Sequence, residues 1–221
     1  MDRIPEPELM DEVEQARAYA AADFSEPHQA FVEHFRQRFA DYNPKQVLDL
    51  GCGPADISIR FARAYPQCTL TGVDGAAAML AFGRDAVSAG GLQSRVELIQ
   101  VYLPGSLPKA GSFDTVISNS LLHHLAEPMV LWDTLKANAS EQAVVFVVDL
   151  LRPDSQAAAH ELVERYASDE TEVLKHDFFH SLLAAYRPEE VDVQLRQAGL
   201  VDHLQVELVS DRHFIIWGRL H

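Results

Sequence analysis

The segment over residues 47–56 constrains the fold of this chain more than any other part of it. It begins with the apolar run Val-Leu-Asp-Leu and continues as Gly-Cys-Gly-Pro-Ala-Asp. An apolar run that ends at two glycines is typical of a buried strand leading into a tight turn, because glycine lets the backbone approach a ligand closely. Pro54 suits the first position of a helix, where a missing N–H costs nothing. The segment therefore predicts a strand, a glycine turn and a helix, which begin a nucleotide-type α/β domain.

The sixth position of the glycine pattern argues against a dinucleotide ligand. The dinucleotide fingerprint has a third glycine there, beside the pyrophosphate, whereas this chain has Asp56. A carboxylate at this position would also repel phosphates, which disfavours an NAD-dependent oxidoreductase. Asp74 ends a second predicted strand over 68–73, where an acid can accept hydrogen bonds from both hydroxyls of a ribose. The two features together favour a nucleoside ligand without phosphates.

Four motifs, in this order, resemble those of the class I S-adenosylmethionine-dependent methyltransferases. They are Val-Leu-Asp-Leu-Gly-Cys-Gly at 47–53, Gly-Val-Asp at 72–74, Met79-Leu80, and Phe-Asp-Thr-Val-Ile-Ser-Asn-Ser-Leu-Leu-His-His-Leu at 113–125. The resemblance covers roughly residues 45–150. It implies that S-adenosylmethionine is the cofactor, that S-adenosylhomocysteine is its product, and that a methyl group passes to an acceptor by in-line displacement.

Alternating strand and helix patterns predict an α/β fold with parallel strands and helices on both faces of the sheet. Strands are expected over 46–50, 68–73, 95–101, 113–118, 143–149, 203–209 and 212–219, and helices over 8–22, 27–40, 54–65, 75–89 and 127–138. The resemblance implies a Rossmann-like, mostly parallel sheet of seven strands with an antiparallel last strand. One domain is expected, comprising an N-terminal helical cap (1–43), a cofactor-binding core (44–150), a helical lid inserted after the fifth strand (151–187), and a final helix and hairpin (188–221).

Charge and composition narrow the class of acceptor. The chain of 221 residues has 33 acidic and 18 basic side chains, so its formal net charge is −15. A surface of this sign repels nucleic acid and anionic membranes, which leaves a small molecule as the expected acceptor. Two cysteines form no disulfide framework, and neither a signal-peptide pattern nor a long apolar run is present. We therefore expect a cytoplasmic enzyme; nothing in the sequence indicates its oligomeric state.

The resemblance implies that the cofactor contacts the glycine turn and the ends of the strands. The expected cofactor-binding residues are Tyr19, Asp49, Gly51, Cys52, Gly53, Asp74, Gly75, Met79, Tyr102 and Asn119. Asp49 is expected to hold the methionine amino group and Asp74 the ribose, although Asp49 could simply orient the loop and Asp74 could simply cap the following helix. Met79 could rest against adenine or belong to the core. Many relatives have an acid that binds the adenine amino group, but this chain has Tyr102 in that region, as a stacking or a packing residue.

The acceptor is expected to meet the histidines that follow the fourth strand of the core. His123 is the predicted catalytic residue, since an imidazole can accept a proton near neutral pH. Adjacent residues on a helical turn should point apart, so we expect one histidine to face the pocket and the other to pack. Either could also be purely structural. The expected substrate-binding residues are His124, Arg152, His176, His180 and Tyr186.

Three further points concern Arg152, a metal and catalysis itself. Arg152 could form a surface ion pair rather than bind an anionic substrate. His176 and His180 have a spacing that suits a metal on a helix, but no third ligand is evident nearby, and no metal is expected. The alternative to an enzyme is a non-catalytic methyltransferase-like protein that acts through a partner.

Overall fold

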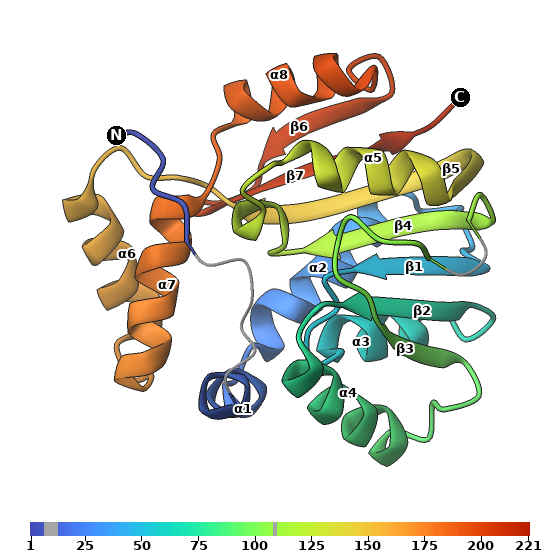
Figure 1. Ribbon diagram of the computed structural model, residues 1–221, viewed down its shortest axis with the longest axis horizontal. Coiled ribbons are helices and arrows are strands. Elements are labelled where there is room, and N and C mark those ends of the chain that lie inside the picture. The colour runs from blue at the N-terminus through green and yellow to red at the C-terminus, as the bar shows by residue number, and fades with distance from the viewer. Residues whose placement is uncertain (7–12, 108–109) are drawn as a thin grey trace.

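Seven strands form one sheet in the order β3-β2-β1-β4-β5-β7-β6 in the computed structural model, which describes residues 1–6, 13–107 and 110–221 (Figure 1). The strands are β1 (Gln46–Leu50), β2 (Thr69–Asp74), β3 (Val96–Gln100), β4 (Phe113–Asn119), β5 (Ala139–Leu150), β6 (Leu204–Leu208) and β7 (His213–Arg219). The pairs among β1 to β5 are parallel, whereas β7 runs antiparallel to both β5 and β6. The predicted Rossmann-like α/β fold with an antiparallel last strand is confirmed.

Helices cover both faces of the sheet. They are α1 (Val13–Ala21), α2 (Ser25–Arg38), α3 (Asp56–Ala64), α4 (Ala77–Ala89), α5 (Met129–Asn138), α6 (Gln156–Ala167), α7 (Glu172–Ala184) and α8 (Pro188–Ala198), with a single 3-10 turn η1 (Leu122–His124). Apolar residues of α5 and α8 share one core cluster with the sheet, and those of α2 and α3 share the other. As predicted, a helical insert follows the fifth strand. The last helix, α8, ends before Gly199, which adopts the left-handed conformation.

The apolar runs of the central strands explain these two layers. Successive side chains of a strand point to opposite faces of the sheet. Val145 and Val147 of β5 accordingly lie in the cluster beneath α5 and α8, while Phe146 lies in the other cluster. There Phe146 meets Phe31 and Phe35 of α2 edge to face, with ring centroids 5.0 and 5.5 Å apart. The helix expected over 27–40 is therefore attached to the sheet by aromatic packing.

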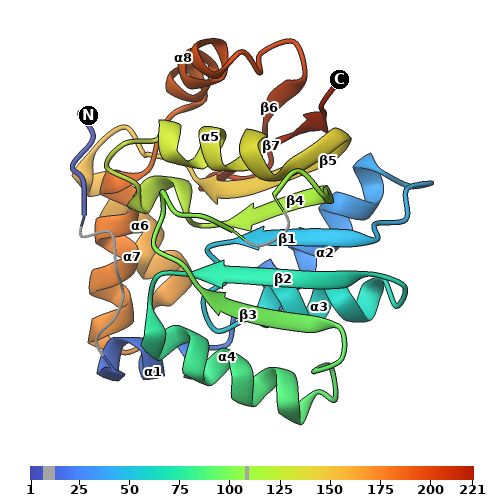
Figure 2. The same ribbon diagram turned by 45° about the vertical axis from the view of Figure 1, so that its right-hand side comes forward.

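The carboxyl ends of the parallel strands all point toward α1, α6 and α7 (Figures 1 and 2). The chain segment over residues 1–6 runs along the same side, and its Ile4 N–H donates to the carbonyl of Leu183 at 3.0 Å. Within the described ranges, no helix has the length and apolar character needed to cross a membrane. Polar residues at the strand ends thus face an edge that other parts of the chain cover.

Two local details differ from the expectations. The helix after the glycine turn begins at Asp56 rather than at Pro54, because Ala55 has a φ of 65° and cannot continue a right-handed helix backward. The fifth strand is longer than predicted: it begins at Ala139 and passes Gln142, which has a φ of 60°. The positive φ of Ala55 is a left-handed conformation, which a glycine would adopt more easily.

Replacing Gly51 by alanine should reduce stability more than the same change at Gly53. Both residues have positive φ, so each alanine costs about 1–2 kcal/mol in the backbone. An added β-carbon at Gly51 would also lie 2.9 Å from Cβ of Leu121, whereas the one at Gly53 would meet nothing within 4 Å. Overpacking of this kind costs a further 1–3 kcal/mol, roughly. Urea denaturation of both variants measures the difference, and equal losses would contradict this packing of the turn.

Candidate functional site

One cavity of about 740 Å³ follows the carboxyl edge of the sheet. A volume of this size is in the range of ligand-binding sites. The expected site residues that line it are Tyr19, Asp49, Gly51, Cys52, Gly53, Asp74, Gly75, Met79, Tyr102, Asn119, His123 and His124. The glycine turn, the ends of β1, β2 and β4, and η1 therefore surround a common space.

The carboxylate of Asp74 connects the glycine turn to the start of α4. Its Oδ2 accepts the backbone N–H of Gly53 at 2.8 Å, and its Oδ1 accepts that of Ala76, also at 2.8 Å. The N–H groups of Gly51 and Cys52 both donate to the carbonyl of Val73, at 2.9 and 3.0 Å. Asp74 thus binds the residue just before α4, whereas Ala76 itself makes no side-chain cap to the first turn of α4. Asp74 also lines the cavity.

Asp49 is a buried carboxyl group at the floor of the cavity. It is 2% exposed, and Oγ of Ser58 donates to its Oδ2 at 2.5 Å. Burial raises the pKa of Asp49 to about 7; the hydrogen bond from Ser58 lowers it and the Asp74 carboxylate raises it. A group of this kind favours a cationic ligand, because a positive charge nearby stabilises the ionised form.

The end of the cavity where the resemblance places adenine is lined by an apolar residue and an exposed aromatic ring. Met79 is 4% exposed and belongs to a small cluster with Ala16 and Ala76, whereas Tyr102 is 55% exposed at the rim. Tyr19 of α1 packs against Phe24 with ring centroids 4.7 Å apart. Helix α1 therefore contributes one wall of the cavity.

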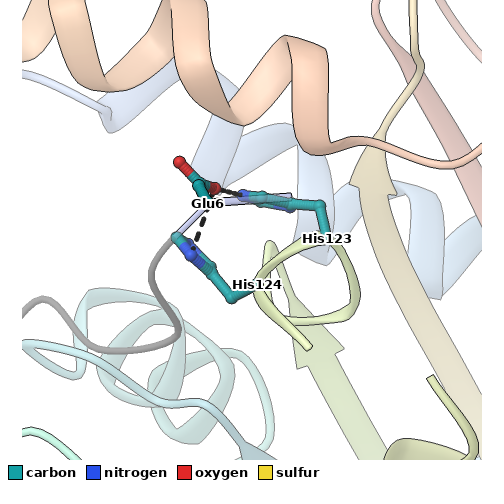
Figure 3. A group of neighbouring side chains, drawn as sticks. All are labelled: Glu6, His123 and His124. Carbon is teal, nitrogen blue, oxygen red and sulfur yellow. Dashed lines mark ion pairs between the residues drawn. The ribbon is translucent and has the colours of Figure 1, made fainter. Parts of the chain in front are cut away.

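The two histidines of η1 lie side by side, so the expectation that they point apart is wrong. Their ring centroids are 4.2 Å apart and their planes differ by 35°. Figure 3 shows both rings turned toward the carboxylate of Glu6, whose Oε1 lies 3.6 Å from Nε2 of His123 and 3.2 Å from Nδ1 of His124. A single turn of helix leaves the side-chain torsions free to bring the two rings to a common partner.

Asp149, at the end of β5, orients His123. Its Oδ1 lies 2.6 Å from Nδ1 of His123, and its Oδ2 accepts the N–H of Leu122 at 2.8 Å. Both side chains are almost completely buried, at 1% and 2% exposure. Burial lowers the pKa of His123, but the Asp149 and Glu6 carboxylates raise it, and the net result is above the ordinary value. Because Nδ1 faces Asp149, Nε2 is the ring nitrogen that faces Glu6.

Sequence reasoning missed Glu6 and Asp149 as site residues. Asp149 gave a usable signal, since it is an acid at the end of a long apolar strand. Glu6 gave no such signal, because the segment over residues 1–6 reaches the site through contacts with residues far away in the sequence. The guanidinium of Arg3 donates to the carbonyls of His123 and Ala184, and it stacks over the Tyr186 ring at 4.2 Å.

Four of the expected substrate residues do not line the cavity. Arg152 is 5% exposed and donates to both carboxylate oxygens of Glu190, at 3.0 and 2.6 Å, so its charge is already paired. The hydroxyl of Tyr186 donates to the carbonyl of Leu125 at 3.2 Å. His176 and His180 of α7 pack against each other, with ring centroids 4.3 Å apart. Their positions support structural roles.

Comparison with known proteins finds sequence similarity mainly in the part of the chain that carries the glycine turn. The sequence model of a methyltransferase domain family matches residues 47–139. Trans-aconitate 2-methyltransferase of Delftia acidovorans is 29% identical over 125 residues, which are 56% of this chain and 44% of that protein. Ribosomal RNA small subunit methyltransferase C of Shigella flexneri is 36% identical over 78 residues, 35% of this chain and 22% of that protein. This chain therefore matches less than half the length of either relative.

Similarity of fold extends over nearly the whole chain. A crystal structure of a SAM-dependent methyltransferase from Aquifex aeolicus has a TM-score of 0.71 and 17% identity, over 95% of this chain and 99% of that one. The two sequence relatives are named for very different acceptors, although both match here. The family model, which matches residues 47–139, includes the glycine turn.

Replacing Asp49 by asparagine should stabilise the ligand-free protein increasingly as pH rises from about 4 to about 7. The folded wild type keeps a proton on Asp49 up to a pKa of about 7, whereas the unfolded chain releases it near 3.8. Wild-type stability therefore falls between these values by on the order of 1 kcal/mol per pH unit, and asparagine removes the loss. Urea denaturation across this range tests it, with the exposed Asp85→Asn as control. A stability difference that does not change with pH would contradict the buried state of Asp49.

Proposed function

Because the chain belongs to the class I S-adenosylmethionine-dependent methyltransferases, we propose that it transfers a methyl group from S-adenosylmethionine to a small-molecule acceptor. The observation that carries this proposal is that one cavity is lined by the glycine turn with Asp49 and Asp74 and also by His123. The donor and an acceptor can then lie in one enclosed space, and the sulfonium supplies its own leaving group. In-line alignment alone contributes on the order of 7–11 kcal/mol to catalysis.

The cofactor would lie along the ends of β1 and β2. In this arrangement the methionine part meets the glycine turn and Asp49, the ribose hydroxyls meet Asp74, and adenine lies between Met79 and the chain near Tyr102. The charge of the cavity lining supports S-adenosylmethionine as the methyl donor. Among the described residues the cavity is lined by seven carboxylate side chains (Asp23, Glu26, Asp49, Asp56, Asp74, Glu170 and Asp177) and by Arg212. Such a lining favours a sulfonium cation over a phosphate-bearing dinucleotide.

His123 would activate the acceptor. Asp149 holds its ring from one side, and the ring lines the cavity near the end of β4. The enclosing parts are α1 and α7, with Asp177, Phe178 and Ser181 of α7 in the lining. An acceptor bounded by helices in this way is a metabolite-sized molecule rather than a long polymer, in agreement with the net charge of −15.

Methyl-labelled S-adenosylmethionine and a fractionated cell extract test this function. The wild-type protein should transfer label to a small-molecule fraction, and His123→Ala should reduce the transfer by roughly 10²-fold or more, because an activating group is lost. His160→Ala is the matched control, since His160 is an exposed residue of α6 outside the cavity lining.

Two outcomes would contradict the proposal. Label that enters only RNA or protein would show that the acceptor class is wrong. A complete lack of transfer by a protein that binds S-adenosylhomocysteine would support the non-catalytic alternative. Equal labelling by wild type and His123→Ala would remove His123 from the catalytic residues.

A further inference from the structure

The three side chains in Figure 3 have the composition of a metal site. Glu6 offers a carboxylate oxygen, and His123 and His124 each offer an imidazole nitrogen, all within 4.8 Å of one another. Two imidazoles and one carboxylate are a known ligand set for zinc and related divalent ions. We propose that Glu6, His123 and His124 bind one divalent transition-metal ion of the zinc class.

The distances fit such an ion. Bonds of about 2.0–2.1 Å in a tetrahedral site place neighbouring ligand atoms about 3.3 Å apart. Oε1 of Glu6 lies 3.2 Å from Nδ1 of His124 and 3.6 Å from Nε2 of His123. These two edges are therefore close to the required length, and all three ligand atoms lie within 4.8 Å of one another.

The carboxylate oxygen at the centre of the group lacks a good alternative partner. The Glu6 side chain is 10% exposed. Among the described residues, its Oε1 has no hydrogen bond of acceptable geometry, although its Oε2 accepts a hydrogen bond from Oγ of Ser181. A buried carboxylate oxygen without a donor is costly. A cation held between Glu6 and the two rings would satisfy it.

Asp149 gives the site the outer support that metal-bound histidines usually have. Because Nδ1 of His123 faces the Asp149 carboxylate at 2.6 Å, the other ring nitrogen, Nε2, faces Glu6 and is the one available to an ion. Carboxylate partners of this kind fix the ring and strengthen it as a ligand. The carboxylates of Glu6 and Asp149 also offset the positive charge of Arg3. The guanidinium of Arg3 donates to the backbone carbonyl of His123 at 2.8 Å.

The position of the group gives the ion access to the cavity. His123 and His124 both line it, as does Ser181. Three protein ligands leave a coordination position for a further oxygen, as in catalytic rather than structural zinc sites. If the proposed function holds, that oxygen belongs to the acceptor, which would then be a hydroxyl or carboxylate compound. The bound ion, rather than a free imidazole nitrogen of His123, would then activate the acceptor, and His123→Ala would lose activity because it removes a metal ligand. Metal binding itself does not depend on the proposed function.

Metal titration of the tag-free full chain, stripped with a chelator, tests the site. Co²⁺ reports coordination by its visible absorption, and Zn²⁺ should displace it. The expected result is one equivalent bound, with an affinity that falls at least about 100-fold in Glu6→Gln and in His124→Ala, and about 10–100-fold in Asp149→Asn. The His176→Ala/His180→Ala double variant is the matched control for the other histidine pair and should bind as the wild type does.

The outcomes separate the metal site from the proposed function. Lack of saturable Co²⁺ or Zn²⁺ binding by the wild type would overturn the metal site, as would binding that survives in Glu6→Gln and His124→Ala or disappears only in the double variant. Zn²⁺ should also raise the Tm of the wild type but not that of Glu6→Gln. This measurement tests the site even if His124→Ala does not fold. S-adenosylhomocysteine binding, measured on the same samples, tests the cofactor site independently.

Discussion

The bond between the Asp74 carboxylate and two backbone N–H groups is the interaction on which the rest of the site depends. One oxygen holds Gly53 and the other holds Ala76, so the turn after β1 and the helix after β2 are fastened to the end of one strand. The parallel pairing of β1 with β2 brings these ends together. With the turn held there, Asp49 and the glycine backbone face the same cavity as the histidines after β4.

The part of the site built on the strands was predictable from the sequence, because each element there has a local cause. A strand buried on both faces is a continuous apolar run, and a residue at its carboxyl end lies at the sheet edge wherever the strand pairs in parallel. The apolar residues before Asp49 and those before Asp74 form such runs, so both acids were expected at the carboxyl edge of the sheet. The contacts made by Asp74 itself were not foreseen in this form. The sequence offers ribose binding and helix capping as alternatives, whereas the carboxylate accepts the N–H groups of Gly53 and of Ala76, the residue before α4.

The acceptor side could not be predicted in the same way, because its contacts join segments far apart in the chain. No local pattern indicates that Glu6 reaches both histidines of η1, or that Glu190 pairs the charge of Arg152. The spacing of adjacent histidines suggested diverging rings, yet a shared carboxylate turns them to one point. The resemblance likewise covers the cofactor half, and relatives with that half in common are named for acceptors as different as trans-aconitate and ribosomal RNA. Under the proposed function, acceptor choice would therefore belong to segments around the core, such as residues 1–6 and α7.

The central claim is that the glycine turn and Asp74 form an S-adenosylmethionine site. Isothermal titration calorimetry with S-adenosylhomocysteine tests it most directly, using wild type, Asp74→Asn and the exposed Asp85→Asn as a control. One-to-one binding is expected for the wild type and for the control, and an affinity weaker by at least about tenfold, equal to about 1.4 kcal/mol, is expected for Asp74→Asn. Lack of binding by the wild type, or an unchanged affinity in Asp74→Asn, would contradict the claim.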